Sequence, residues 1–81
     1  MTISAVRIDS RVRDVLVSDE ELEVRLCDGR VISAPLIWFP RLLKASSDQR
    51  KVWEPCAAGF GIHWPLIDED LSVEGLLRAS A

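Results

Sequence analysis

The residues best suited to chemistry lie near the C-terminal end, where the only histidine, His63, precedes three consecutive acids. Those acids are Asp68, Glu69 and Asp70, and carboxylates together with an imidazole can hold a divalent cation. Side chains of consecutive residues rarely point at one position, and the chain has no second histidine. We therefore expect no metal site. We interpret the acids as residues just before a helix N-terminus, where the helix dipole favours negative charge.

His63 also has the chemistry of a general acid or base near neutral pH. Cys56 lies near it in the sequence, so a Cys–His dyad is the closest arrangement to a nucleophilic site. No known motif spacing ties a serine or cysteine to this histidine, which is flanked by Ile62 and Trp64 as a structural histidine often is. The sequence therefore predicts no catalytic residue and no cofactor. An enzyme that uses His63 with the acids is the third-ranked interpretation.

Aromatic residues supply a second candidate site. Trp38 and Trp64 each stand one or two residues before a proline, which places a large ring beside a rigid bend. Exposed tryptophan close to arginine is typical of binding hot spots. We predict a protein-interaction surface composed of Trp38, Arg41, His63, Trp64, Asp68, Glu69 and Asp70. The alternative, in which all three tryptophan rings belong to the core, is about as well supported.

Basic residues are interleaved with these rings, as in proteins that stack single-stranded nucleic acid between aromatic side chains. They are Arg41, Lys44, Arg50 and Lys51. The net charge of −3 argues against a phosphate-binding surface. Amphipathic helices with leucines inward and cations outward explain the same residues. Nucleic-acid binding or transcriptional regulation is therefore the alternative function.

Composition predicts one folded domain over residues 1–81, with residues 1–10 and 79–81 frayed, because 48% of the residues are hydrophobic and 28% are charged. The first residues lack the apolar core of a signal peptide, and no run reaches the roughly 18 apolar residues of a membrane span. Cys27 and Cys56 have no partner at metal-ligand spacing. We expect a cytoplasmic protein with both thiols reduced and no membrane association.

Alternation of apolar and polar residues predicts three antiparallel strands, over residues 12–17, 22–27 and 30–34. The dipeptide Asp28-Gly29 favours a two-residue type I′ turn, which pairs Leu26 with Val31. The apolar face then contains Leu22, Val24, Leu26 and Val31. A four-residue loop over residues 18–21 places Val17 opposite Leu22 and Val15 opposite Val24.

The second half of the chain predicts shorter elements. Pro40 suits the first turn of a helix over residues 40–45, and Ser46 with Gln49 forms a capping box for a second helical turn. A fourth strand is expected over residues 61–64, and Ser72 is the expected N-cap of a last helix. The predicted fold is α+β, a three- to four-stranded antiparallel sheet packed on one face by short helices.

Two sequence blocks resemble the bacterial DUF2442 family. They read W-F-P-R-L-L from Trp38 and H-W-P-L-I-D-E-D-L-S-V-E-G-L-L from His63, and the resemblance extends over residues 11–78. It implies a small α+β domain from the bacterial cytosol, with no established activity and no accepted catalytic residues.

The resemblance also bears on partners, because relatives can sit beside another small domain in an arrangement resembling toxin–antitoxin pairs. Some relatives carry a C-terminal helix-turn-helix domain; these 81 residues include none, so no DNA-binding role is carried over. We therefore expect a non-catalytic protein-interaction module, an antitoxin-like partner of a small neighbouring protein, or a self-associating chain.

Overall fold

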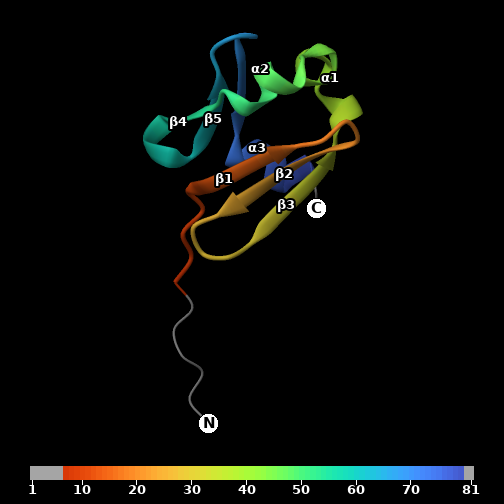
Figure 1. Cartoon of the computed structure of the whole chain (residues 1–81). Coiled ribbons are helices and arrows are strands. Elements are labelled where there is room, and N and C mark those ends of the chain that lie inside the picture. Colours follow the sequence, from red (N-terminus) through yellow and green to blue (C-terminus); the bar gives the residue numbers. More distant parts are fainter. Residues whose placement is uncertain (1–6, 80–81) are drawn as a thin grey trace.

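The computed structural model describes residues 7–79, which form two antiparallel three-stranded sheets connected by short helices (Figure 1). The first sheet contains β1 (Val12–Val17), β2 (Glu21–Leu26) and β3 (Val31–Pro35) in that order. The second contains β4 (Glu54–Cys56), β5 (Gly61–Trp64) and β6 (Glu69–Ser72). The predicted α+β class is confirmed, and the expected fourth strand, β5, is the centre of a second sheet.

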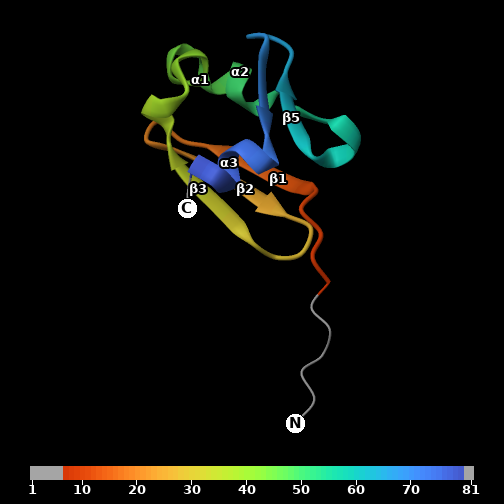
Figure 2. The same ribbon diagram turned by 180° about the vertical axis from the view of Figure 1, so that it is seen from behind.

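Short helical segments link and cover the sheets. They are the 3-10 helices η1 (Leu36–Trp38) and η2 (Ala57–Gly59) and the α-helices α1 (Pro40–Lys44), α2 (Ser47–Lys51) and α3 (Val73–Ala79). Seen from behind, α3 lies across one face of the first sheet, with β5 and β6 rising beside it (Figure 2). Between residues 7 and 79, no helix has the length and apolar character needed to cross a membrane.

The register between β1 and β2 confirms the prediction, because Val17 pairs with Leu22 and Val15 with Val24. Ser18 fixes the connecting loop: its hydroxyl accepts the backbone N–H of Glu21 at 3.1 Å, and its own N–H donates to the Glu21 carbonyl at 3.0 Å. A serine hydroxyl that replaces a backbone partner in this way stabilises a tight turn.

The hairpin between β2 and β3 differs from the prediction by one residue. Gly29 N–H donates to the Leu26 carbonyl at 3.1 Å, and Leu26 N–H donates to the Arg30 carbonyl at 2.9 Å. The loop therefore has three residues, and Gly29, at φ +95°, takes the left-handed position that follows such a turn. As a result, Val24 pairs with Ile32 and not with Ser33.

This shift exchanges the two faces of β3, because side chains alternate along a strand. Ile32 is 5% exposed and Val31, expected in the core, is 53% exposed. Ala34 is buried beside Ile32. The observed register buries two apolar residues, whereas the predicted one would have buried Ser33, whose hydroxyl needs a hydrogen-bond partner away from water.

The core lies between the first sheet, α3, α1 and the second sheet. Its buried residues are Val15, Leu22, Val24, Leu26, Ile32, Leu36, Leu42, Ile62, Trp64, Val73 and Leu76. Pro40 begins α1 as expected, and the capping box is confirmed, with Ser46 Oγ accepting Gln49 N–H at 3.1 Å and Gln49 Oε1 accepting Ser46 N–H at 2.9 Å. Leu42 from α1 is buried, whereas Leu43, also expected to face inward, is exposed.

The C-terminal part contains a strand where the acids were expected to lead into a helix. Asp70 belongs to β6, which pairs with β5, and only after Ser72 does α3 begin. Ser72 is the N-cap as predicted, because its hydroxyl accepts the N–H of Gly75 at 2.9 Å. The strand was missed because its stability comes from pairing with β5 and not from its own β-propensity.

Residues before β1 are attached to the hairpin. Asp9 N–H donates to the Asp28 carboxylate at 3.1 Å, and Arg11 donates two side-chain hydrogen bonds to Asp9. The Arg11 guanidinium lowers the pKa of Asp9 to about 2. Of the residues expected to fray, 1–6 and 80–81 lie outside the described part of the chain.

The register makes a direct prediction about stability. Replacing Ile32 by alanine leaves a cavity in the core and should lower the free energy of unfolding by about 2–5 kcal/mol, whereas Val31→Ala should change it by no more than about 0.5 kcal/mol. Urea denaturation of both variants measures the difference. Should Ile32→Ala fail to fold, Ile32→Val is the milder variant. Equal losses at the two positions would contradict the register.

A second prediction concerns the charge of Asp9. Because its pKa is depressed in the folded state, its contribution to stability is present above its ordinary value of 3.8 and is lost as the pH falls towards 2. Carboxyl-carbon NMR should give a midpoint near pH 2 for Asp9, and Arg11→Gln should raise that midpoint towards 3.8. An unchanged midpoint in the variant would remove Arg11 as the cause.

Candidate functional site

Trp64 does not belong to the surface to which the sequence assigned it. Its ring is 0% exposed, and its indole N–H donates to the backbone carbonyl of Arg50 at 3.1 Å. It lies on the inward face of β5 together with Ile62, which is also fully buried. This correction follows from strand alternation, since β5 turns Ile62 and Trp64 to the core and His63 outward.

Arg50 is also internal, although the sequence placed it with the outward-facing cations. Its Nε donates to the Leu42 carbonyl at 2.9 Å, and one Nη donates to the Leu43 carbonyl at 3.1 Å. The other Nη contacts Asp19 at 2.8 Å. These carbonyls lie near the end of α1, where backbone acceptors have few donors within the helix, and the Leu42 carbonyl also accepts the Ala45 N–H at 3.2 Å. Arg50 is therefore unavailable to the positive face that nucleic-acid binding requires.

His63 and Asp70 face each other on the outward side of the second sheet. They are a cross-strand pair between β5 and β6, and His63 Nδ1 lies 2.6 Å from Asp70 Oδ1. Glu54 of β4 pairs with His63 on its other side. The sheet thus brings one histidine and one carboxylate into contact. His63 does not line the groove described below.

The three consecutive acids diverge. The Asp68 carbonyl accepts a hydrogen bond from Arg41, which joins α1 to the turn before β6. Glu69 accepts the Asp70 N–H at 3.0 Å, and Asp70 contacts His63. Within residues 7–79, no group of three or more His, Cys, Asp or Glu side chains is arranged to hold a metal ion. Cys27 and Cys56 are free thiols in the structure.

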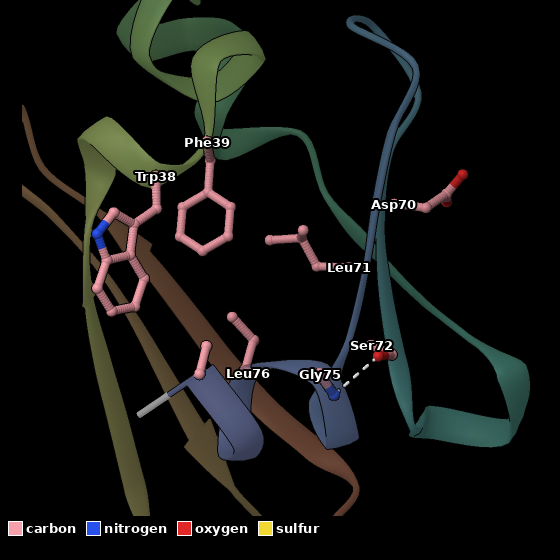
Figure 3. Close-up of a pocket in the computed structure, with 8 residues that line it drawn as sticks. Trp38, Phe39, Asp70, Leu71, Ser72, Gly75 and Leu76 are labelled. Atoms are coloured by element: carbon pink, nitrogen blue, oxygen red, sulfur yellow. Dashed lines mark hydrogen bonds between the residues drawn. The ribbon is translucent and has the colours of Figure 1, made fainter. Parts of the chain in front are cut away.

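A groove of about 430 Å³ lies between η1, β6 and α3 (Figure 3). We name it the Trp38 groove, and its lining residues are Trp38, Phe39, Asp70, Leu71, Ser72, Gly75, Leu76 and Ala79. Figure 3 shows the side chains of Trp38, Phe39, Leu71 and Leu76 around one space. The Trp38 side of the groove is accessible, because this residue is 50% exposed.

The β6 side of the groove has a different chemistry. In Figure 3 the side chains of Asp70 and Ser72 point away from the space into which Leu71 projects. Both residues nevertheless line the groove, so their contribution is largely the main chain. The groove therefore offers apolar rings and leucines on most sides and polar backbone groups along one strand.

Sequence reasoning found only part of this site. It identified Trp38 and Asp70 but not Phe39, Leu71 or Leu76. The alternation of Leu71 with acidic and serine neighbours was a period-two signal for a half-buried strand, and it was masked by the interpretation of the acids as a helix start. Arg41 lies beside the turn before β6 and does not line the groove.

The comparisons with known proteins decide the family. The model for a protein family of unknown function, DUF2442, matches residues 12–81. The chain belongs to the DUF2442 family. The resemblance expected from the tryptophan-containing blocks is thereby confirmed. A comparison with curated proteins found no match.

A solved structure supports the DUF2442 fold. A protein of unknown function from Rhodospirillum rubrum ATCC 11170, known from a crystal structure at 2.75 Å resolution, is similar to this chain with a TM-score of 0.71 and 31% identity. The match covers 85% of this chain and 86% of that chain. The two proteins therefore share a fold over most of their length, and the description of that protein assigns it no activity.

The different positions of two tryptophans give a testable prediction. Trp64→Phe removes the donor to the buried Arg50 carbonyl and should lower the free energy of unfolding by about 1–3 kcal/mol. Trp38→Phe should change it by no more than about 0.5 kcal/mol, but should clearly reduce the fluorescence that acrylamide quenches, with partly buried Trp53 contributing the remainder. Thermal unfolding and quenching of both variants measure this. Quenching that Trp38→Phe leaves undiminished would contradict the exposure of Trp38.

Proposed function

We propose that this protein is a non-catalytic protein-interaction module that binds another protein through the Trp38 groove. The observation that carries the proposal is a half-exposed tryptophan beside a groove lined by Phe39, Leu71 and Leu76. Burying such a ring against a partner removes a large apolar surface from water. Tryptophan is also enriched among the residues that dominate binding energy.

The surroundings of the groove support a protein partner. Exposed apolar side chains continue past Trp38 to Ile37 on η1, and Arg41 follows on α1. A mixture of an aromatic anchor, aliphatic neighbours and arginine is typical of interface centres. The groove contributes apolar surface and backbone polar groups, a composition that suits recognition. A small protein encoded next to this chain, as the family resemblance suggested, is the first partner to test.

The test uses two neighbouring exposed residues with different relations to the groove. Trp38→Ala removes a groove wall, whereas Ile37→Ala shortens an exposed side chain that does not line it. Tagged wild-type protein and both variants are used to capture partners from the native cell lysate, and the captured protein is then purified and titrated by calorimetry. We expect a 1:1 complex that Ile37→Ala retains and Trp38→Ala weakens by about 30-fold or more.

Circular dichroism and thermal unfolding establish that both variants remain folded before binding is compared. A partner that binds wild type and Trp38→Ala equally would contradict the use of the groove. Capture of nucleic acid, released by salt, would replace the proposal with the alternative function.

A further inference from the structure

We propose that the occupant of the Trp38 groove is an extended segment of another polypeptide, which lies beside β6 as an added strand and inserts one large apolar side chain. This rests on the proposed function, because it specifies how the partner is held. Strand addition to an exposed sheet edge is a recurrent mode of peptide recognition, in which main-chain hydrogen bonds combine with side-chain pockets.

The first observation is that β6 is an edge strand, since β5 is its only neighbour in the sheet. Along an antiparallel pair, backbone groups point alternately towards the partner strand and away from it. Val73 N–H donates to the Phe60 carbonyl at 2.9 Å, directly beside the Gly61–Ser72 pair. Counting from this hydrogen bond, the N–H and C=O groups of Leu71 point towards β5, whereas those of Asp70 and Ser72 point outward.

Most outward groups along this edge already have partners. The Asp70 N–H donates to Glu69 Oε1, and Arg41 occupies the Asp68 carbonyl. Ser72 is the N-cap of α3, so its carbonyl belongs to the first turn of the helix. Along the described edge this leaves the Asp70 carbonyl and the Ser72 N–H, one acceptor and one donor on either side of Leu71. Both residues line the groove.

An added strand that used these two groups would be held in a fixed register. Its residue opposite Leu71 would turn its side chain to the same face as Leu71, because paired residues share a face. That face carries the groove, so the side chain would enter beside Trp38, Phe39 and Leu76 (Figure 3). The two free backbone groups determine which partner residue lies opposite Leu71, and the apolar space accepts the side chain of that same residue.

Charge defines the residues on either side of this anchor. Neighbours of the anchor would lie on the opposite face, next to Asp70, whose side chain is 66% exposed. One Asp70 oxygen contacts His63, and a carboxylate has a second oxygen that accepts hydrogen bonds. We therefore infer a partner segment in which a large apolar residue is flanked by lysine or arginine.

The same charge disfavours a second copy of this chain as the occupant. Two β6 strands paired antiparallel through the same two groups would set Asp70 of each copy opposite Ser72 of the other, so the two Asp70 carboxylates would share a face at diagonal positions about 7–8 Å apart. Like charges at this separation repel each other and oppose the pairing. A basic segment from a different protein would instead place positive charge beside the Asp70 carboxylate.

The probe is a short capped peptide with the sequence threonine-lysine-phenylalanine-lysine-threonine, titrated up to about 5 mM into ¹⁵N-labelled protein and followed by NMR. Backbone dependence is measured with peptides that carry a single N-methyl group, placed in turn on each residue. This change removes one N–H donor and leaves the protein unaltered. Alanine for phenylalanine and glutamate for lysine test the anchor and the charge.

We expect peptide binding to shift the amide of Ser72 and the indole of Trp38. One N-methyl position should weaken binding by about ten-fold, because its N–H is the donor to the Asp70 carbonyl. The alanine and glutamate peptides should bind at least as weakly. Asp70→Asn should weaken the lysine peptide, whereas Glu54→Gln, on the same face but at β4, should leave it unchanged.

Three results would overturn the inference. Absence of any shift at Ser72 up to 5 mM would remove the added strand. Equal binding by every N-methylated peptide would leave an apolar pocket without backbone recognition. A Ser72 shift that grows with protein concentration alone, together with a dimer mass, would assign the edge to a second copy. Trp38-dependent capture of a partner alongside a failed peptide titration would retain the proposed function and reject strand addition only.

Discussion

The buried contact between Arg50 and Trp64 is the centre of a hydrogen-bond network that connects two helices with both sheets. The Arg50 backbone carbonyl accepts the Trp64 indole N–H, which attaches α2 to the second sheet. The guanidinium of the same residue bonds the carbonyls of Leu42 and Leu43 near the end of α1 and reaches Asp19 in the loop of the first sheet. One residue therefore joins α1, α2 and both sheets.

This contact stabilises the fold, and it also requires that every acceptor of the buried guanidinium is held in position. A buried guanidinium that loses a partner keeps its desolvation cost, so each acceptor must stay in place. The last carbonyls of a five-residue helix such as α1 have few donors within the helix; Arg50 supplies a donor to the Leu43 carbonyl and a second one to the Leu42 carbonyl, which also accepts the Ala45 N–H. Because Phe39 is the N-cap of α1, the fixed helix also fixes the wall that Trp38 and Phe39 form. The groove is thus a consequence of how the core is closed.

The two walls of the groove come from distant parts of the sequence. Trp38 follows the first sheet and Leu71 belongs to the last strand, and Arg41 bridges these regions through the Asp68 carbonyl. The edge strand β6 is partly protected by Glu69 and Arg41, since bonded backbone groups cannot recruit another chain. Because only the Asp70 carbonyl and the Ser72 N–H are left free along this edge, an added strand could pair only along the groove. A protected edge with one open position limits pairing with another chain to that position.

Local patterns determined several elements by themselves. The alternation of Leu22, Val24 and Leu26 established β2, and the Ser46–Gln49 capping box established the start of α2, because both depend on residues close in sequence. The family also followed from contiguous blocks around Trp38 and His63. Of the candidate site, the sequence named Trp38 without deciding whether its ring is exposed, and it grouped His63 with Asp70.

Tertiary structure alone decided the rest. The register of β3 depended on whether Ile32 or Val31 could be buried against β2, a choice that a turn dipeptide does not make. The strand β6 exists because β5 offers it backbone partners, and Trp64 is buried on the inward face of β5, where the Arg50 carbonyl accepts its indole N–H. Periodicity indicates which residues share one face of a strand or helix. Only packing between segments distant in the sequence decides what that face packs against. For this reason the candidates for the groove could be named from the sequence, and the folded chain selected among them.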